Sequence, residues 1–173
     1  AYSCEALALA RDNLFAAVHH PTLEAKQAML LAAHRSGQAI ALTKTTAPHA
    51  LSYVLTSNFG IPHGHAVALT LGEMLLYNSL ATEDDTLDPR GLNYLQNTLV
   101  EICTLLRCET PYAASRYLND LLSALGLPAR LSALGIRPEQ ITTIADSVDS
   151  DRLSNNPRNL PRNERISLLE RIL

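Results

Sequence analysis

The sequence is poor in cysteine and glycine, and each scarcity argues against a class of protein. The three cysteines, Cys4, Cys103 and Cys108, form no CxxC pair, which argues against a disulfide framework and favours reduced, packed thiols in a cytosolic protein. With 7 glycines in 173 residues and 47% hydrophobic residues, the composition is not that of a disordered chain. We therefore expect a folded protein with a sizeable core.

Long apolar runs and clustered basic residues are also missing. No segment reaches the roughly 18 apolar residues that a membrane span requires, and the N-terminus lacks the basic-then-apolar plan of a secretory signal. The 14 Lys and Arg are scattered among 17 Asp and Glu, giving a net charge of -3, whereas phosphate binding needs clustered cations. We expect neither nucleic acid nor membrane as a partner, and a cytoplasmic location.

Apolar residues recur at the helical spacing through the first half of the chain. This spacing predicts helices over residues 6–18 and 22–42, the second of them capped by Thr22. A third helix is predicted over 49–56, and a fourth over 63–80 that is apolar on nearly every side and so the central one.

The second half of the chain continues the helical pattern after an exposed acidic connection. Two amphipathic helices are predicted within 92–108 and 110–126, the latter beginning at Thr110. A short helix, a stop at Gly135, a further capped helix, a polar loop and a terminal helix follow. The sequence shows no strand and no repeat, so we predict a single all-α domain over residues 1–173, a bundle of about seven or eight helices.

Three of the six histidines fall within "APHALSYVLTSNFGIPHGHAVAL", residues 47–69. His49 and His63 are 14 residues apart, and the intervening turn allows two helix segments to bring both imidazoles to one metal ion. The same spacing also fits a satisfied core histidine at 49 and a helix-start residue at 63. His65 points roughly 200° away from His63 on a helix, toward a substrate or toward solvent.

A third ligand is not visible in the sequence. No acidic residue stands four positions before any histidine, and Glu73 lies more than two turns beyond His63. Metal sites that perform chemistry generally use three or more protein groups. On its own residues, the chain does not complete a metal site.

At this point the stretch "PHALSYVLTSNFGIPHG" resembles the metal-ligand segment of the iron-containing alcohol dehydrogenases. In that family a first histidine is followed 14 positions later by the histidine of a Pro-His-Gly triplet, as His49 is followed here by His63. The tail "LSNNPRNLPRNERISLLERIL" resembles the Asn-Pro-Arg segment that precedes the last helix of the family. The resemblance thus spans the chain and favours the metal interpretation.

The resemblance implies an enzyme of which this chain is only a part. Family members join an N-terminal nucleotide-binding α/β domain to a C-terminal helical domain, and this chain resembles the latter. The implied metal is Fe(II), with Zn(II) as the alternative, held by His49, His63 and an Asp-x-x-x-His motif upstream of residue 1. NAD or NADP and a small alcohol or aldehyde are the implied cofactor and substrate. The isolated piece would bind metal weakly and lack activity, and homo-oligomerisation is left open.

One departure from the family pattern concerns the substrate pocket. Family members with a His-x-x-x-His pattern carry their second histidine where this chain has Tyr53, which either donates a hydrogen bond to a substrate or simply packs. "TTAPHALSY" and "GIPHGHAVALTLGEM" resemble the branch that handles phosphonoacetaldehyde and related small aldehydes. His65 is then a candidate contact for an anionic group.

Two other interpretations stay open from the sequence. Dehydroquinate synthase-like or glycerol dehydrogenase-like enzymes share the implied architecture. Alternatively, the chain is a non-catalytic helical remnant or interaction module whose histidines persist without an assembled site.

Overall fold

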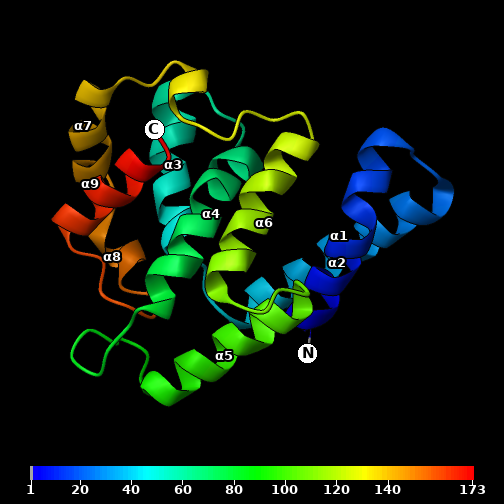
Figure 1. The fold of residues 1–173 in the computed structure, drawn as a ribbon, viewed down its shortest axis with the longest axis horizontal. Coiled ribbons are helices and arrows are strands. Elements are labelled where there is room, and N and C mark those ends of the chain that lie inside the picture. The colour runs from blue at the N-terminus through cyan, green and yellow to red at the C-terminus, as the bar shows by residue number, and fades with distance from the viewer. Residues whose placement is uncertain (1) are drawn as a thin grey trace.

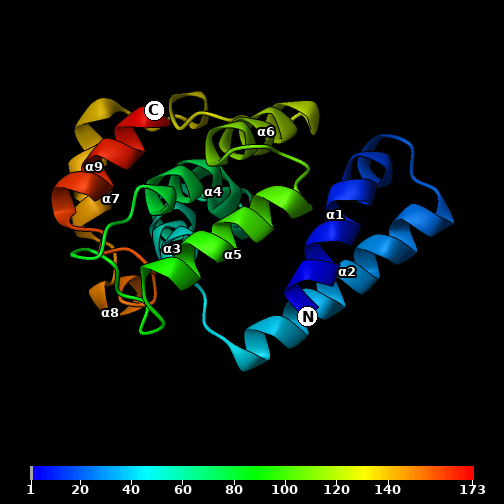
Figure 2. The same cartoon turned by 60° about the horizontal axis from the view of Figure 1, so that its bottom comes forward.

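The computed structural model describes residues 2–173 and opens with a helical hairpin. Helices α1 (Tyr2–His19) and α2 (Leu23–Leu42) pack along each other, and the Thr22 hydroxyl caps α2 by accepting from the Ala25 N–H at 3.2 Å. Figure 2 shows this hairpin beside the remaining helices. Both helices cover the predicted ranges.

Helices α3 (Ala47–Phe59) and α4 (His63–Ser79) form the centre of the molecule (Figure 1). Pro48 lies in the first turn of α3, where its missing N–H costs nothing, and Gly60 caps the end of α3 with a left-handed φ of 68°. Packing of α4 against α3, α5, α6 and α9 explains why its sequence is apolar on most sides. The largest fully buried side chains of this pair of helices are Leu51, Leu55, Leu69 and Met74.

Helices α5 (Leu92–Leu105) and α6 (Pro111–Ala124) complete the bundle around α4. Thr110 caps α6 as predicted, since its hydroxyl accepts from the Ala113 N–H at 3.1 Å. The structure therefore confirms the amphipathic pair expected from the sequence.

The C-terminal third is built from shorter elements around the same core. Helices α7 (Ile141–Asp146), α8 (Ser150–Leu153) and α9 (Arg162–Arg171) pack beside α3 and α4, after two short 3-10 turns, η1 (Ser132–Leu134) and η2 (Pro138–Gln140). The all-α prediction is confirmed, since residues 2–173 contain nine α-helices and no strand. Where a polar loop was predicted, the structure has the four-residue α8, which is too short to show a periodic pattern.

The structure also describes the cysteines and the length and apolar character of the helices. Cys4, Cys103 and Cys108 are free thiols, of which only Cys103 is buried. Across residues 2–173, no helix combines the length and the apolar character that crossing a bilayer demands.

Hydrogen bonds connect the Asn-Pro-Arg segment, residues 156–158, to the end of α4 and the loop that follows it. The buried amide nitrogen of Asn156 donates to Asn78 Oδ1 at 2.9 Å, and Asn78 Nδ2 donates back to Asn156 Oδ1 at 3.4 Å. Arg158 donates from Nε to Asp85 Oδ2 and from Nη1 to the Tyr77 carbonyl, both at 2.8 Å. These bonds join segments that are more than 70 residues apart in sequence.

Replacing Asn156 by leucine is expected to destabilise the fold by about 2 kcal/mol, because the buried Asn78 amide would lose its partner. That loss corresponds to a fall of roughly 4–8 °C in melting temperature, measurable by circular dichroism. Asn159→Leu is the matched control, since the Asn159 side chain is exposed. Equal melting temperatures for the two variants would contradict the role assigned to Asn156.

Candidate metal centre

Two short elements of structure bring His49 and His63 together. His49 lies in the first turn of α3, where its backbone N–H donates to the Thr46 carbonyl at 3.0 Å. The left-handed turn at Gly60 reverses the chain, and α4 then begins at His63. The two imidazole centroids lie 5.4 Å apart with an interplanar angle of 61°. The convergence on which the metal interpretation depends is therefore present.

The buried hydroxyl of Ser52 determines which nitrogen of His63 carries the proton. Ser52 Oγ donates its single hydrogen to the His49 carbonyl at 2.7 Å. Its contact with His63 Nδ1 at 3.2 Å must then be one in which Nδ1–H donates to Oγ. This assignment leaves the Nε2 lone pair of His63 free, which is the usual arrangement when a polar neighbour orients a metal-binding imidazole.

The surroundings of His49 keep its imidazole neutral. Partial burial, and secondarily the neighbouring His63, lower the pKa of His49 below its ordinary value. Metal ions bind only the neutral imidazole, so a lowered pKa keeps His49 available as a ligand at neutral pH. Both histidines thus have the donor chemistry that Fe(II) or Zn(II) requires.

Within the described part of the chain, no further metal-binding side chains are grouped with His49 and His63. Residues 2–173 contain no group of three or more His, Cys, Asp or Glu placed to hold a metal ion. His49 is half-buried and His63 is exposed, so both lie at an accessible face of the bundle. Two imidazoles with centroids 5.4 Å apart fit the chemistry of part of a metal-binding site.

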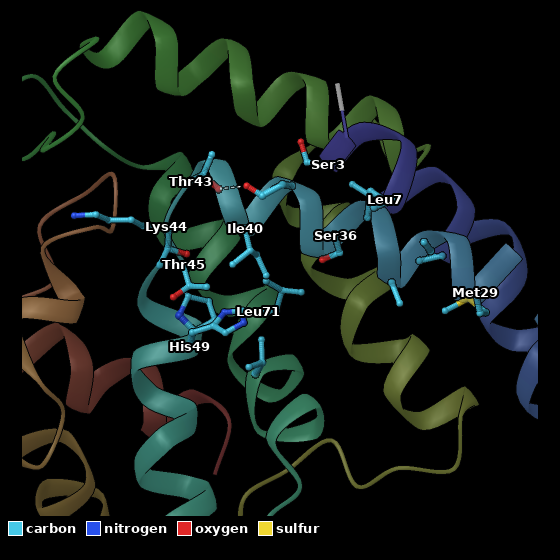
Figure 3. A pocket seen from close by; sticks show the side chains of 18 residues that line it. Ser3, Leu7, Met29, Ser36, Ile40, Thr43, Lys44, Thr45, His49 and Leu71 are labelled. Carbon is cyan, nitrogen blue, oxygen red and sulfur yellow. Dashed lines mark hydrogen bonds between the residues drawn. The ribbon is translucent and has the colours of Figure 1, made fainter.

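A cavity of about 560 Å³ adjoins His49 between the hairpin and the first turns of α3. Figure 3 shows His49 beside Thr45 at one end of this cavity and Met29 toward the other, while the Lys44 side chain extends away from His49. Alanine and other apolar side chains make up most of the wall. The cavity therefore adjoins His49 but is not lined by His63.

The two candidate pocket residues from the sequence have different surroundings. The Tyr53 ring is 43% exposed and its centroid lies 5.7 Å from that of His63, so this residue does border the histidine pair. His65 faces elsewhere, and its Nε2–H donates to the Pro128 carbonyl at 2.7 Å. Only Nδ1 of His65 is left for a further contact.

Sequence reasoning missed two residues at this site. Ser52 carried no signal, because its importance comes from a contact with a residue 11 positions away. The sequence predicts a polar loop that contains Arg152, yet its guanidinium carbon lies 4.3 Å from the centroid of the Tyr53 ring. A single arginine in a polar segment does not indicate that α8 packs against α3.

Comparisons with known proteins identify the family and the fold of the chain. Residues 1–173 match the model of the Fe-containing alcohol dehydrogenase family, C-terminal. A phosphonoacetaldehyde reductase from Streptomyces viridochromogenes is 37% identical over 142 residues, which is 82% of this chain and 35% of that protein. The chain therefore spans about a third of the length of this curated relative.

Solved structures show the same fold. An alcohol dehydrogenase from Oenococcus oeni superposes with a TM-score of 0.83 at 20% identity, over 98% of this chain and 44% of that one. A sulfoacetaldehyde reductase from Bifidobacterium kashiwanohense, solved in complex with NAD+, gives a TM-score of 0.78 at 26% identity, over 98% of this chain and 42% of that one. In both cases less than half of the solved chain is matched.

Proposed function

This chain belongs to the Fe-containing alcohol dehydrogenase family, and from that premise we propose that it is the metal- and substrate-binding helical domain of a cytoplasmic aldehyde reductase. The reaction is reduction of a small aldehyde to its alcohol, in which hydride from NADH or NADPH and one proton are added across the carbonyl. The observation that carries the proposal is the pair His49 and His63, held 5.4 Å apart with the His63 tautomer fixed by Ser52.

We further propose that the chain is the C-terminal part of a longer two-domain enzyme. Its coverage of 35% of the curated relative and 42–44% of the two solved chains supports this proposal. Residues 2–173 place no third His, Cys, Asp or Glu in a group with His49 and His63, which supports it as well, because a catalytic metal generally needs three or more protein ligands. The remaining ligands would come from an Asp-x-x-x-His motif preceding residue 1, and the nicotinamide site from an N-terminal domain.

Within this chain each residue has a distinct task. His49 and His63 hold the metal, Fe(II) or Zn(II), in their neutral forms, and Ser52 keeps the Nε2 lone pair of His63 available. The bound metal supplies Lewis-acid polarisation of the substrate oxygen. Tyr53, beside His63 at an exposed face, is placed to donate a hydrogen bond from its hydroxyl to the substrate.

The relatives point to the class of aldehyde. The named substrates of the two reductases, phosphonoacetaldehyde and sulfoacetaldehyde, both join an aldehyde to an anionic group through one methylene. We propose an aldehyde of this kind as the substrate. Tyr53 borders His63 and is the candidate for a substrate contact there. His65 could contact the substrate only through Nδ1, because the Pro128 carbonyl occupies its Nε2.

The test uses the full-length enzyme purified without metal and then loaded with Fe(II) or Zn(II). We expect loaded enzyme to oxidise NADH or NADPH in the presence of phosphonoacetaldehyde, and expect a chelator to remove that activity. Residues 1–173 alone should show none, since they lack the nucleotide-binding part. A loaded full-length protein that reduces no aldehyde would contradict the proposal and favour the non-catalytic helical module.

Ser52→Ala is expected to weaken Zn(II) binding by about 10–100-fold, because His63 would lose the acceptor that fixes its tautomer. A competition titration against a chromophoric chelator measures the affinity. Ser115→Ala is the matched control, since Ser115 is a buried serine on α6, away from the histidines. Equal affinity in the Ser52 variant and the control would show that Ser52 does not orient the ligand.

A further inference from the structure

The guanidinium group of Arg152 stacks on the ring of Tyr53. Its guanidinium carbon lies 4.3 Å from the Tyr53 ring centroid, within the range of a cation–π contact. Tyr53 in turn lies beside His63, with 5.7 Å between ring centroids. A fixed positive charge, a phenol and a metal-binding histidine therefore follow one another along a single face of the bundle.

The position of Arg152 is set by its helix. Leu153, the next residue, is 7% exposed and belongs to the main core, and the Asp149 carboxylate caps α8 by accepting from the Asp151 N–H at 2.9 Å. Helix α8 packs against α3, which carries Tyr53 and His49. The exposed side chain of Arg152 is thus anchored through its backbone next to the candidate metal centre.

Arg152 also retains its capacity to bind an anion. Its one ion pair, with Asp149 at 3.4 Å, joins two side chains that are each about half exposed. Such solvated pairs contribute little and exchange readily. A guanidinium presents parallel N–H groups that match two oxygens of a phosphonate or sulfonate, which a lysine cannot do as well.

We propose that Arg152 is the specificity-determining residue that binds the anionic group of the substrate while the aldehyde faces the metal centre. The inference rests on the proposed function. It requires a short substrate, because Arg152 and His63 both lie close to the Tyr53 ring, at 4.3 Å and 5.7 Å from its centroid. The nearby alternative, Lys44, borders the cavity next to His49, but its side chain extends away from that histidine (Figure 3).

The experiment compares a charged and an uncharged aldehyde in the metal-loaded full-length enzyme. For Arg152→Met we expect kcat/KM for phosphonoacetaldehyde to fall about 10–100-fold, mainly through KM, while the value for propanal stays within about threefold. Arg152→Lys should recover part of the loss. Arg90→Met is the matched control, because Arg90 likewise stacks on a tyrosine, Tyr94, and pairs with an aspartate.

Several results would overturn the assignment. One is a fall in kcat/KM in Arg152→Met that is equal for both aldehydes. Another is a fall in kcat/KM for phosphonoacetaldehyde that is no larger in Arg152→Met than in Arg90→Met. A third is a fall selective for phosphonoacetaldehyde that occurs in Lys44→Met instead. A wild-type enzyme that reduces propanal but no anionic aldehyde would also overturn it, while leaving the reductase function intact.

If the wild-type enzyme reduces neither aldehyde, the proposed function itself fails, and calorimetry with 2-hydroxyethylphosphonate then decides on Arg152 alone. Binding that is about tenfold weaker in Arg152→Met than in wild type supports the anion site. Equal or absent binding in the two proteins rejects it.

Discussion

Replacing both His49 and His63 by alanine is expected to lower the metal affinity of the full-length enzyme by at least about a thousandfold. The two imidazole centroids lie 5.4 Å apart, and residues 2–173 contain no group of three or more His, Cys, Asp or Glu that could hold the metal instead. Metal content after dialysis and the shift of melting temperature on adding Fe(II) or Zn(II) both report this loss. Aldehyde reduction should disappear with the metal.

The matched control removes two histidines that lie elsewhere. His20 and His34 are exposed on the N-terminal hairpin, so His20→Ala with His34→Ala should leave metal content and activity unchanged. If metal shifts the melting temperature of the His49 and His63 double variant as much as that of wild type, these histidines are not the ligands.

Gly72→Val is expected to destabilise the fold by about 3 kcal/mol or more, the largest stability effect of any single substitution considered. A Cβ at this position would lie 2.9 Å from the Ser115 carbonyl oxygen and 3.2 Å from Asn119 Oδ1, because α4 and α6 approach closely there. The backbone oxygen cannot turn aside, so the helices must separate. Thermal unfolding should show a melting temperature lower by roughly 6–12 °C.

Gly37→Val provides the contrast within the same protein. Gly37 also lies inside a helix, α2, but a Cβ there meets no atom within 4 Å. Valine has a better intrinsic helix propensity than glycine, so the melting temperature should stay constant or rise. A similar fall in both variants would mean that the close contact between α4 and α6 does not explain the effect of Gly72→Val.

The helices could be predicted from the sequence because their signals are local. Thr22, Thr110 and Pro48 mark helix starts through bonds or backbone angles within a few residues, and the structure places α2, α6 and α3 accordingly. Helix α8 gave no such signal, since four residues are too few for a periodic pattern. For the same reason, the position of Arg152 beside Tyr53 could not be predicted.

Features that depend on contacts between residues distant in sequence could not be predicted. A spacing of 14 residues fits a metal pair, and it also fits two unrelated histidines. Only the folded turn at Gly60 brings the rings of His49 and His63 to a centroid distance of 5.4 Å. The role of the Asn-Pro-Arg segment likewise depends on Asn78, which is 78 residues from Asn156. The spacing of apolar residues along the sequence cannot indicate a pairing of this kind.

The direct test of the central claim is an anomalous difference map from crystals of the metal-loaded full-length enzyme, recorded at the absorption edge of the metal. We expect one dominant peak at about 2.0–2.2 Å from a ring nitrogen of both His49 and His63, with Nε2 as the ligating atom of His63. The other protein ligands should come from residues that precede Ala1. A fully occupied metal bound elsewhere, with His49 and His63 left unligated, would contradict the account.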